Sequence, residues 1–152
     1  MRITIFTACV LTIISFATPF THAIGPCTHD NNSLRCVKFV KNYDGDTITF
    51  LINRVHPILG ENIGVRIRGI YTPEMKSSDP CEKEKAEVAQ QVVNKILANG
   101  KRIDLHNIGR GKYFRIVADV EVDGLSVGDH LIRKHLAYRY DGGTKQPVNW
   151  CH

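Results

Sequence analysis

Three short runs of β-branched and aromatic residues precede the first strong helical pattern, and this order is what most constrains the fold. The runs cover residues 36–43, 47–52 and 63–70. Asp-Gly between the first two predicts a hairpin, with the glycine supplying a positive φ, and a loop covers residues 53–62. Consecutive strands before a helix exclude a doubly wound parallel sheet.

The remaining pattern predicts a helix, two strands and a second helix. Asp79 caps the first helix, Pro80 and Glu82 suit its first and third positions, and Asn99-Gly100 ends it. The strands cover residues 101–108 and 113–122, and the second helix begins after Ser126 and ends near residue 136. Residues 27–35 and 137–152 are expected to be irregular. The fold class is therefore α+β, mainly β: a five-stranded OB-type Greek-key barrel with two helices.

Composition places the chain among globular proteins with a basic surface. It has 152 residues, of which 43% are hydrophobic and 23% charged, with a formal net charge of +5. It contains neither a repeat nor a low-complexity stretch, which excludes solenoids, propellers and disordered tails. The positive charge favours polyanionic partners.

Residues 1–23 are expected to be a secretory signal peptide, and residues 24–152 the folded domain. Met1-Arg2 precedes an uncharged apolar run, and Thr21-His22-Ala23 provides small residues for cleavage. The alternative is an uncleaved membrane anchor, because the run is only just long enough to span a bilayer. Cleavage predicts an extracytoplasmic protein, periplasmic or secreted, with no membrane attachment.

Four cysteines remain after cleavage, and in an exported protein they predict two disulfides. Of the three connectivities, we favour Cys27 with Cys36 and Cys81 with Cys151. A zinc site is the alternative, but the chain has no C-x2-C pair and the spacings are irregular.

Polar residues at three places are candidates for chemistry. Residues 44–47 (DGDT) put two carboxylates in the first hairpin, although a simple turn has the same pattern. Residues 66–74 (RIRGIYTPE) carry two arginines on one strand face and end in a rigid turn with a carboxylate. Residues 109–115 (GRGKYFR) are basic and aromatic, a pattern that a solvated loop also has. Together they provide the base and the cations that hydrolysis of a phosphodiester requires.

These motifs resemble the staphylococcal nuclease (thermonuclease) family. The resemblance rests on YDGDTITF, VRIRGIYTPE and KYFR, followed by an apolar strand and LIRKHLAYRY, and it covers residues 36–141. The CEKEKA helix start and the terminal WC are similar to exported bacterial members. The resemblance implies a five-stranded OB barrel that hydrolyses single- or double-stranded DNA and RNA with Ca2+ and leaves 3′-phosphate ends. A monomer is expected.

The resemblance also implies a role for individual residues. Glu74 corresponds to the general base that activates water, and Arg66 and Arg115 to the arginines that stabilise the pentacoordinate phosphate. Arg115 would also lie near the leaving 5′ oxygen. Lys112 and Tyr113 correspond to positions that contact a neighbouring phosphate.

The implied metal ligands are Asp46, through its carboxylate, and Thr72, through its backbone carbonyl. A second aspartate of the family is replaced here by Tyr71, and a neutral phenol is a poor ligand for a hard cation. Asp44 as a substitute ligand, another divalent ion and metal-free chemistry are the alternatives. A second departure is Phe114, which stands where the family has glycine and is expected to shift Arg115 or narrow the site.

Two non-enzymatic functions remain as alternatives: a non-catalytic OB module that binds nucleic acid or a protein, and a structural interaction module. His130 and His135 lie on different helix faces and are expected to be surface residues. Tyr138 and Tyr140 either stack on bases or pack on the barrel. Trp150 is expected to be structural.

Overall fold

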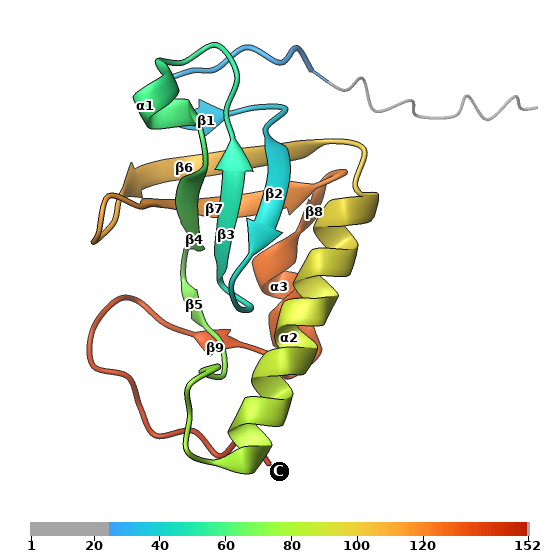
Figure 1. Cartoon of the computed structure of the whole chain (residues 1–152), viewed down its shortest axis with the longest axis vertical. Helices are drawn as coiled ribbons and strands as arrows, with labels where there is room; N and C mark the ends of the chain where they lie inside the picture. Colours follow the sequence, from blue (N-terminus) through green and yellow to red (C-terminus); the bar gives the residue numbers. More distant parts are fainter. Residues whose placement is uncertain (1–24, 152) are drawn as a thin grey trace, which may run out of the picture.

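The computed structural model describes residues 25–151. The predicted signal peptide therefore lies outside the described residues. Within them the chain forms nine strands and three helices, which confirms the α+β class (Figure 1). No helix of this part is both long enough and apolar enough to cross a bilayer.

A seven-stranded mixed sheet forms the body of the molecule. Its order is β1-β6-β7-β4-β3-β2, with β8 beside β7, and the β4–β7 pair is parallel. Its strands are β1 (Ser33–Leu34), β2 (Lys38–Asn42), β3 (Thr47–Leu51), β4 (Ile63–Ile67), β6 (Ile103–Arg110), β7 (Ile116–Val122) and β8 (Leu125–Ser126). In Figure 1, β6 and β7 cross behind β2, β3 and β4 at a steep angle, so the sheet is strongly curved. We expected a five-stranded OB-type barrel; the described residues form seven paired strands, and the pairing ends at β1 and β2 without closing.

Two of the three helices confirm the sequence predictions. Helix α2 (Pro80–Asn99) begins after Asp79, whose carboxylate accepts the Cys81 N–H at 2.9 Å. Helix α3 (Val127–Arg133) begins after Ser126, whose hydroxyl accepts an N–H from its first turn, but it ends earlier than predicted. The loop at 53–62 contains a helical turn that the sequence did not indicate, α1 (Pro57–Gly60).

The core lies between the concave face of the sheet and helices α2 and α3. Ile48 and Phe50 of β3, Val65 of β4 and Leu105 of β6 are fully buried there. Helix α2 contributes a face of small and branched residues, Ala86, Ala89, Val93 and Leu97. Because alternate residues of β3 and β4 face this core, the intervening residues face outward at fixed positions.

The hairpin of β2 and β3 is confirmed, but the reason for its glycine is not the one we expected. Tyr43 N–H donates to Thr47 O at 3.0 Å across the turn. Gly45 does not have a positive φ. Instead, a Cβ at Gly45 would lie 2.8 Å from Thr72 Cγ2 and 3.0 Å from Ala89 Cβ. Glycine is needed because the turn packs closely on α2 and on the Thr72 segment.

Two segments that we predicted to be irregular contribute short strands. Ser33 and Leu34 form β1, which pairs with β6. Tyr138 and Arg139 form β9, which pairs with β5 (Ile70–Tyr71) in a separate two-stranded sheet. Neither strand has a sequence pattern of its own, because both are ordered by partners far away in the chain.

Both predicted disulfides are present. Cys27 is bonded to Cys36 near the start of the described residues, and Cys81 at the start of α2 is bonded to Cys151 in the tail. The second bond joins residues 70 positions apart. It brings the tail after β9 against the N-terminal end of α2, beside the turn that follows β5 (Figure 1).

Candidate active site

An open groove of about 1100 Å3 lies where β4, the β6–β7 loop and the C-terminal tail meet. Its basic side chains come from segments that are far apart in the sequence, and they are Arg66, Arg68, Arg110, Lys112, Arg115 and Lys145. Two acidic side chains of the described residues, Glu74 and Asp141, also line it. A concave surface with this excess of cations attracts anions.

The groove brings together five of the residues that the sequence singled out. Arg66, Glu74 and Arg115 line it, and so do Lys112 and Tyr113. The implied metal ligands lie behind it, since Asp46 and Thr72 are buried, with exposed fractions of 4% and 3%.

Asp46 holds Arg66 at the edge of the groove. Thr47 of β3 pairs with Arg66 of β4, and the Ile67 N–H donates to Asp46 O at 2.8 Å. These contacts place Asp46, directly before β3, beside Arg66. Asp46 Oδ1 forms an ion pair with Arg66 Nη1 and accepts the Thr47 hydroxyl at 3.0 Å. The Arg66 guanidinium is thereby fixed before any ligand binds.

The buried Asp46 carboxylate has a raised affinity for protons. Burial raises the pKa of Asp46 from 3.8 to about 6, although the Arg66 guanidinium beside it acts in the opposite direction. The negative charge of Asp44 adds to the increase. Asp44 itself is engaged in the turn, since its Oδ1 accepts the N–H groups of Asp46 and Thr47 at 3.0 and 2.6 Å.

This pKa predicts that ionisation of Asp46 lowers the stability of the fold as the pH rises to neutral. Between about pH 4 and pH 6 the folded protein binds more protons at Asp46 than the unfolded chain does, so this contribution to stability falls as the pH rises. Relative to the wild type, Asp46→Asn should therefore gain about 2 kcal/mol in free energy of unfolding between about pH 4 and pH 7.5. Urea unfolding at both pH values, with the disulfides intact, measures this change. A difference that stays constant with pH would contradict it.

Glu74 stands at the groove on a turn that is held by side chains of α2 and of the tail. Its N–H donates to Glu82 Oε1 at 3.0 Å, and Ser77 Oγ donates to Glu82 Oε2 at 2.6 Å. Its own carboxylate is about half-exposed and forms an ion pair with Lys145. Glu74 is thus oriented by its backbone and remains accessible to solvent.

Arg115 enters the groove from the start of β7. Its stem packs on Gly64 of β4, where a Cβ would lie 3.1 Å from Arg115 Cγ. The Arg115 N–H donates to Lys112 O at 3.2 Å, and the guanidinium lies 5.7 Å from the centre of the Tyr113 ring. Arg115 Nε donates to Lys112 O at 3.4 Å, but none of the ion pairs found among the described residues involves Arg115, so its charge is not neutralised by a carboxylate.

The turn before Arg115 has an unusual backbone. Tyr113 and Phe114 have φ angles of 57° and 58°, a left-handed conformation that is costly for aromatic residues. Both side chains are exposed, Tyr113 by 87% and Phe114 by 57%. The predicted start of a strand at Tyr113 is therefore wrong, and β7 begins at Ile116.

Tyr71 belongs to an aromatic cluster. Its ring centre lies 6.0 Å from that of Tyr138, 5.7 Å from that of Tyr140 and 5.8 Å from that of Trp150. Its hydroxyl donates to Gln146 O at 3.2 Å, and burial raises its pKa above 10, so the phenol is neutral. Tyr71 thus attaches the tail to the body of the protein, and the cluster explains why Tyr138 and Trp150 pack here.

The oxygen donors around Asp46 do not fit a calcium site. Ca2+ takes roughly six to eight oxygen ligands, several of them carboxylates. Asp46 is paired with an arginine, Asp44 caps the turn, and Tyr71 is bonded to the tail. Across residues 25–151, no three His, Cys, Asp or Glu are grouped so that they could hold a metal ion.

Two functional residues escaped the sequence analysis. Lys145 lies in the tail, which looked irregular, and no sequence signal connects it with Glu74. Glu82 was interpreted only as part of the first turn of α2, but its carboxylate holds the turn that carries Glu74. The Cys81–Cys151 pairing was the one available indication that the tail returns to this turn.

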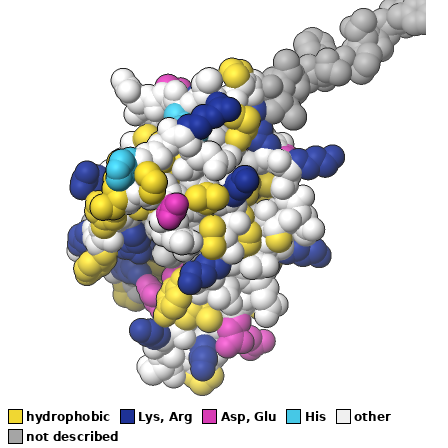
Figure 2. All heavy atoms as spheres, turned by 45° about the horizontal axis from the view of Figure 1, so that its top comes forward, with side chains coloured by type: hydrophobic (Ala, Val, Ile, Leu, Met, Phe, Trp, Pro, Cys, Tyr) yellow, Lys and Arg dark blue, Asp and Glu magenta, His cyan; other side chains and the backbone are white. Residues whose placement is uncertain are grey.

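The surface charge agrees with the composition of the groove. Figure 2 shows basic side chains at several places on the face that it draws, with a group of them at its left edge. In Figure 1 the loop between β6 and β7, which carries Lys112 and Arg115, lies on that side of the molecule. An anionic polymer would meet an excess of positive charge along this edge.

Comparison with known proteins points to one family. Residues 64–148 match the family described as Staphylococcal nuclease homologue. Endonuclease YncB of Bacillus subtilis (strain 168) is 34% identical over 125 residues, which is 77% of this chain and 56% of that protein. The SPbeta prophage-derived endonuclease YokF of the same organism is 37% identical over 108 residues, 67% of this chain and 34% of that protein.

A plant protein is similar as well. The probable staphylococcal-like nuclease CAN1 of Oryza sativa subsp. japonica is 29% identical over 94 residues, which is 62% of this chain and 26% of that protein. The chain thus spans between about a quarter and just over half of the length of these relatives. The part of this chain that matches the family, residues 64–148, includes Arg66, Glu74 and Arg115.

Proposed function

Because the chain belongs to the staphylococcal nuclease family, we propose that it is a nuclease that hydrolyses DNA, RNA or both with low sequence specificity. The observation that carries this proposal is a single groove that combines a solvent-accessible carboxylate with two arginines held by neighbouring strands. Phosphodiester hydrolysis requires a base for water and cations on the phosphoryl oxygens, and these are the groups present.

In this mechanism Arg66 and Arg115 hold the non-bridging oxygens of the scissile phosphate. Glu74 accepts a proton from a water molecule as its oxygen attacks phosphorus. The bond from phosphorus to the leaving 5′ oxygen breaks, and that oxygen takes up a proton from solvent. The guanidiniums stabilise the extra negative charge of the pentacoordinate transition state. Lys112 and Tyr113 bind a neighbouring phosphate of the same strand.

Lys145 and Asp46 position these groups. Lys145 pairs with Glu74 in the free protein and moves to a phosphate when substrate enters, which releases the carboxylate to act as a base. Asp46 keeps the Arg66 guanidinium directed at the groove. Members of the family typically use Ca2+. Because the oxygen atoms around Asp46 do not fit a Ca2+ site, we assign the catalytic roles in this mechanism to the chain's own residues.

The fold and the compartment complete the proposal. We assign the curved sheet to the OB fold that the family implies, on the order and the steep crossing of its strands. We place the protein outside the cytoplasm, because its two disulfides are consistent with an oxidising compartment and residues 1–23 have the pattern of a signal peptide.

The test is cleavage by Glu74→Gln. The purified, oxidised protein should degrade single-stranded DNA or RNA, assayed in Ca2+, Mg2+, Mn2+ or EDTA. The variant should be slower by about 10²- to 10⁴-fold, because the amide cannot accept the proton of water. Its binding to the same strands should persist, since Arg66 and Arg115 are untouched.

A matched control keeps this test specific. Glu84→Gln makes the same change of charge on the exposed surface of α2 and should cleave at the wild-type rate. Cleavage by Glu74→Gln at the wild-type rate would contradict the assignment of the base. A wild-type protein that binds strands but cleaves none would instead favour a non-catalytic binding module, the alternative suggested by Tyr71.

A further inference from the structure

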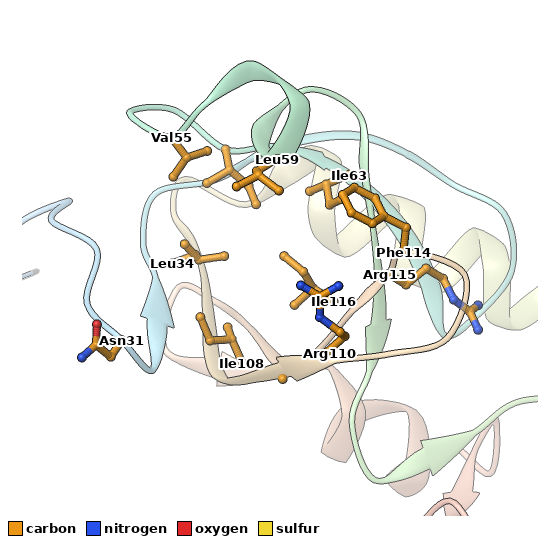
Figure 3. A pocket seen from close by; sticks show the side chains of 12 residues that line it. Asn31, Leu34, Val55, Leu59, Ile63, Ile108, Arg110, Phe114, Arg115 and Ile116 are labelled. Carbon is orange, nitrogen blue, oxygen red and sulfur yellow. The ribbon is translucent and has the colours of Figure 1, made fainter.

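A second hollow, which we call the apolar cleft, lies beside the groove. Its volume is about 400 Å3, and its walls are aliphatic side chains of β1, α1, β4, β6 and β7, among them Leu34, Leu59 and Ile108. Figure 3 shows these side chains directed toward a common space beneath α1. Ligand sites in proteins have volumes of roughly 300–1,000 Å3 and are mostly apolar, so the cleft has the size and the character of one.

The apolar cleft and the groove share two arginines. Arg110 and Arg115 line both hollows. In Figure 3 the Arg115 guanidinium points away from the cleft while its stem lies at the mouth. A ligand with its anionic group on Arg115 would therefore lie beside the mouth of the cleft, where an attached planar group can reach the Phe114 ring.

Phe114 stands at the mouth of the cleft on a strained backbone. Its ring is 57% exposed, and in Figure 3 it extends toward Ile63 across one side of the opening. A large apolar side chain that is exposed in a left-handed conformation is costly, and such strain is typical of functional sites. The ring offers a flat surface next to a phosphate-binding arginine.

We propose that the apolar cleft receives one unstacked base of a single-stranded nucleic acid, with Phe114 as its stacking surface and Arg115 on the adjacent phosphate. A nucleic-acid strand carries an anionic phosphate next to an aromatic base at every nucleotide, and any of the bases can stack on an aromatic side chain. Paired bases of a duplex are held in their own stack and do not enter. The inference rests on the proposed function and adds to it a separate subsite for a base.

The experiment compares two labelled octamers of equal charge by fluorescence anisotropy, with the wild type and each variant carrying Glu74→Gln so that cleavage does not consume the strands. One is oligothymidylate, and the other is a deoxyribose-phosphate strand without bases. The wild type should bind oligothymidylate about 5- to 150-fold more tightly, the range expected for one stacked base. Phe114→Gly should remove most of this preference and leave the affinity for the abasic strand unchanged. Glycine adopts the φ of 58° freely, so this variant should fold.

A matched pair on α1 tests the cleft independently of Phe114. Leu59 lines the cleft, whereas its neighbour Ile58 is 70% exposed and does not. Leu59→Asn should reduce the preference for bases, and Ile58→Asn should leave it intact. Wild-type preference in both Phe114→Gly and Leu59→Asn would overturn the assignment of the cleft. Failure of both octamers to bind the wild type would instead overturn the proposed function.

Discussion

Replacing Tyr71 with aspartate is expected to lower the free energy of unfolding by about 4 kcal/mol and to create no affinity for calcium. The substitution restores the residue type that the family has at this position. Here, however, the side chain is 7% exposed and its ring contacts Tyr138, Tyr140 and Trp150. Aspartate would leave a cavity in that cluster and would place a carboxylate among aromatic rings.

Tyr71→Phe is the matched control for this prediction. It keeps the ring contacts and loses only the hydrogen bond from the hydroxyl to Gln146 O, so it should cost about 1 kcal/mol. Urea unfolding measures both variants, and calorimetric titration with Ca2+ measures the affinity. An aspartate variant that is as stable as the wild type and binds Ca2+ would show that Asp46 and its neighbours can form a metal site after all.

Local sequence signals predicted the parts of the fold that local interactions determine. The DGDT turn and the β-branched and aromatic runs on either side of it placed β2 and β3, and Asp79-Pro80 placed the start of α2 to the residue. Caps and turns act through neighbouring residues, so their signals are present in a short window. The disulfide pairing that we favoured is present, although the sequence alone allowed three connectivities.

Structure that depends on interactions between distant residues was not predicted from the sequence. Strand β1 forms because Ser33 and Leu34 pair with β6. Strand β9 forms because Tyr138 and Arg139 pair with β5. Two-residue strands have no periodicity to detect. The left-handed turn at Phe114 is a further case, because the preference of an aromatic residue for extended backbone is overridden by the tight connection of β6 and β7.

The same distinction between local and non-local interactions applies to the candidate site. Arg66 and Glu74 lie within one motif, and Arg115 lies in another, so their types and order were readable. The ion pair of Glu74 with Lys145 depends on where the tail returns, and the use of Asp46 depends on its burial behind Arg66. Sequence thus indicated which groups are available for chemistry, whereas the fold determines which of them are already engaged.

The Cys81–Cys151 bond attaches the tail that carries Lys145. Replacing both of these cysteines with serine should lower the free energy of unfolding by about 4 kcal/mol. The bond joins positions 70 residues apart, so in the unfolded chain it closes a long loop and removes much conformational entropy. Urea unfolding of the oxidised wild type and of the double serine variant measures the loss.

The Cys27–Cys36 pair is the internal control, because its separation is 9 residues. Its removal should cost about 3 kcal/mol, so the two variants should differ by about 1 to 2 kcal/mol in the order of their loop lengths. Equal losses, or the reverse order, would mean that native contacts at the bonds outweigh chain entropy. For the Cys81–Cys151 bond those contacts are the packing of Trp150 on Tyr71 and Tyr138, which Trp150→Ala would remove while leaving the bond in place.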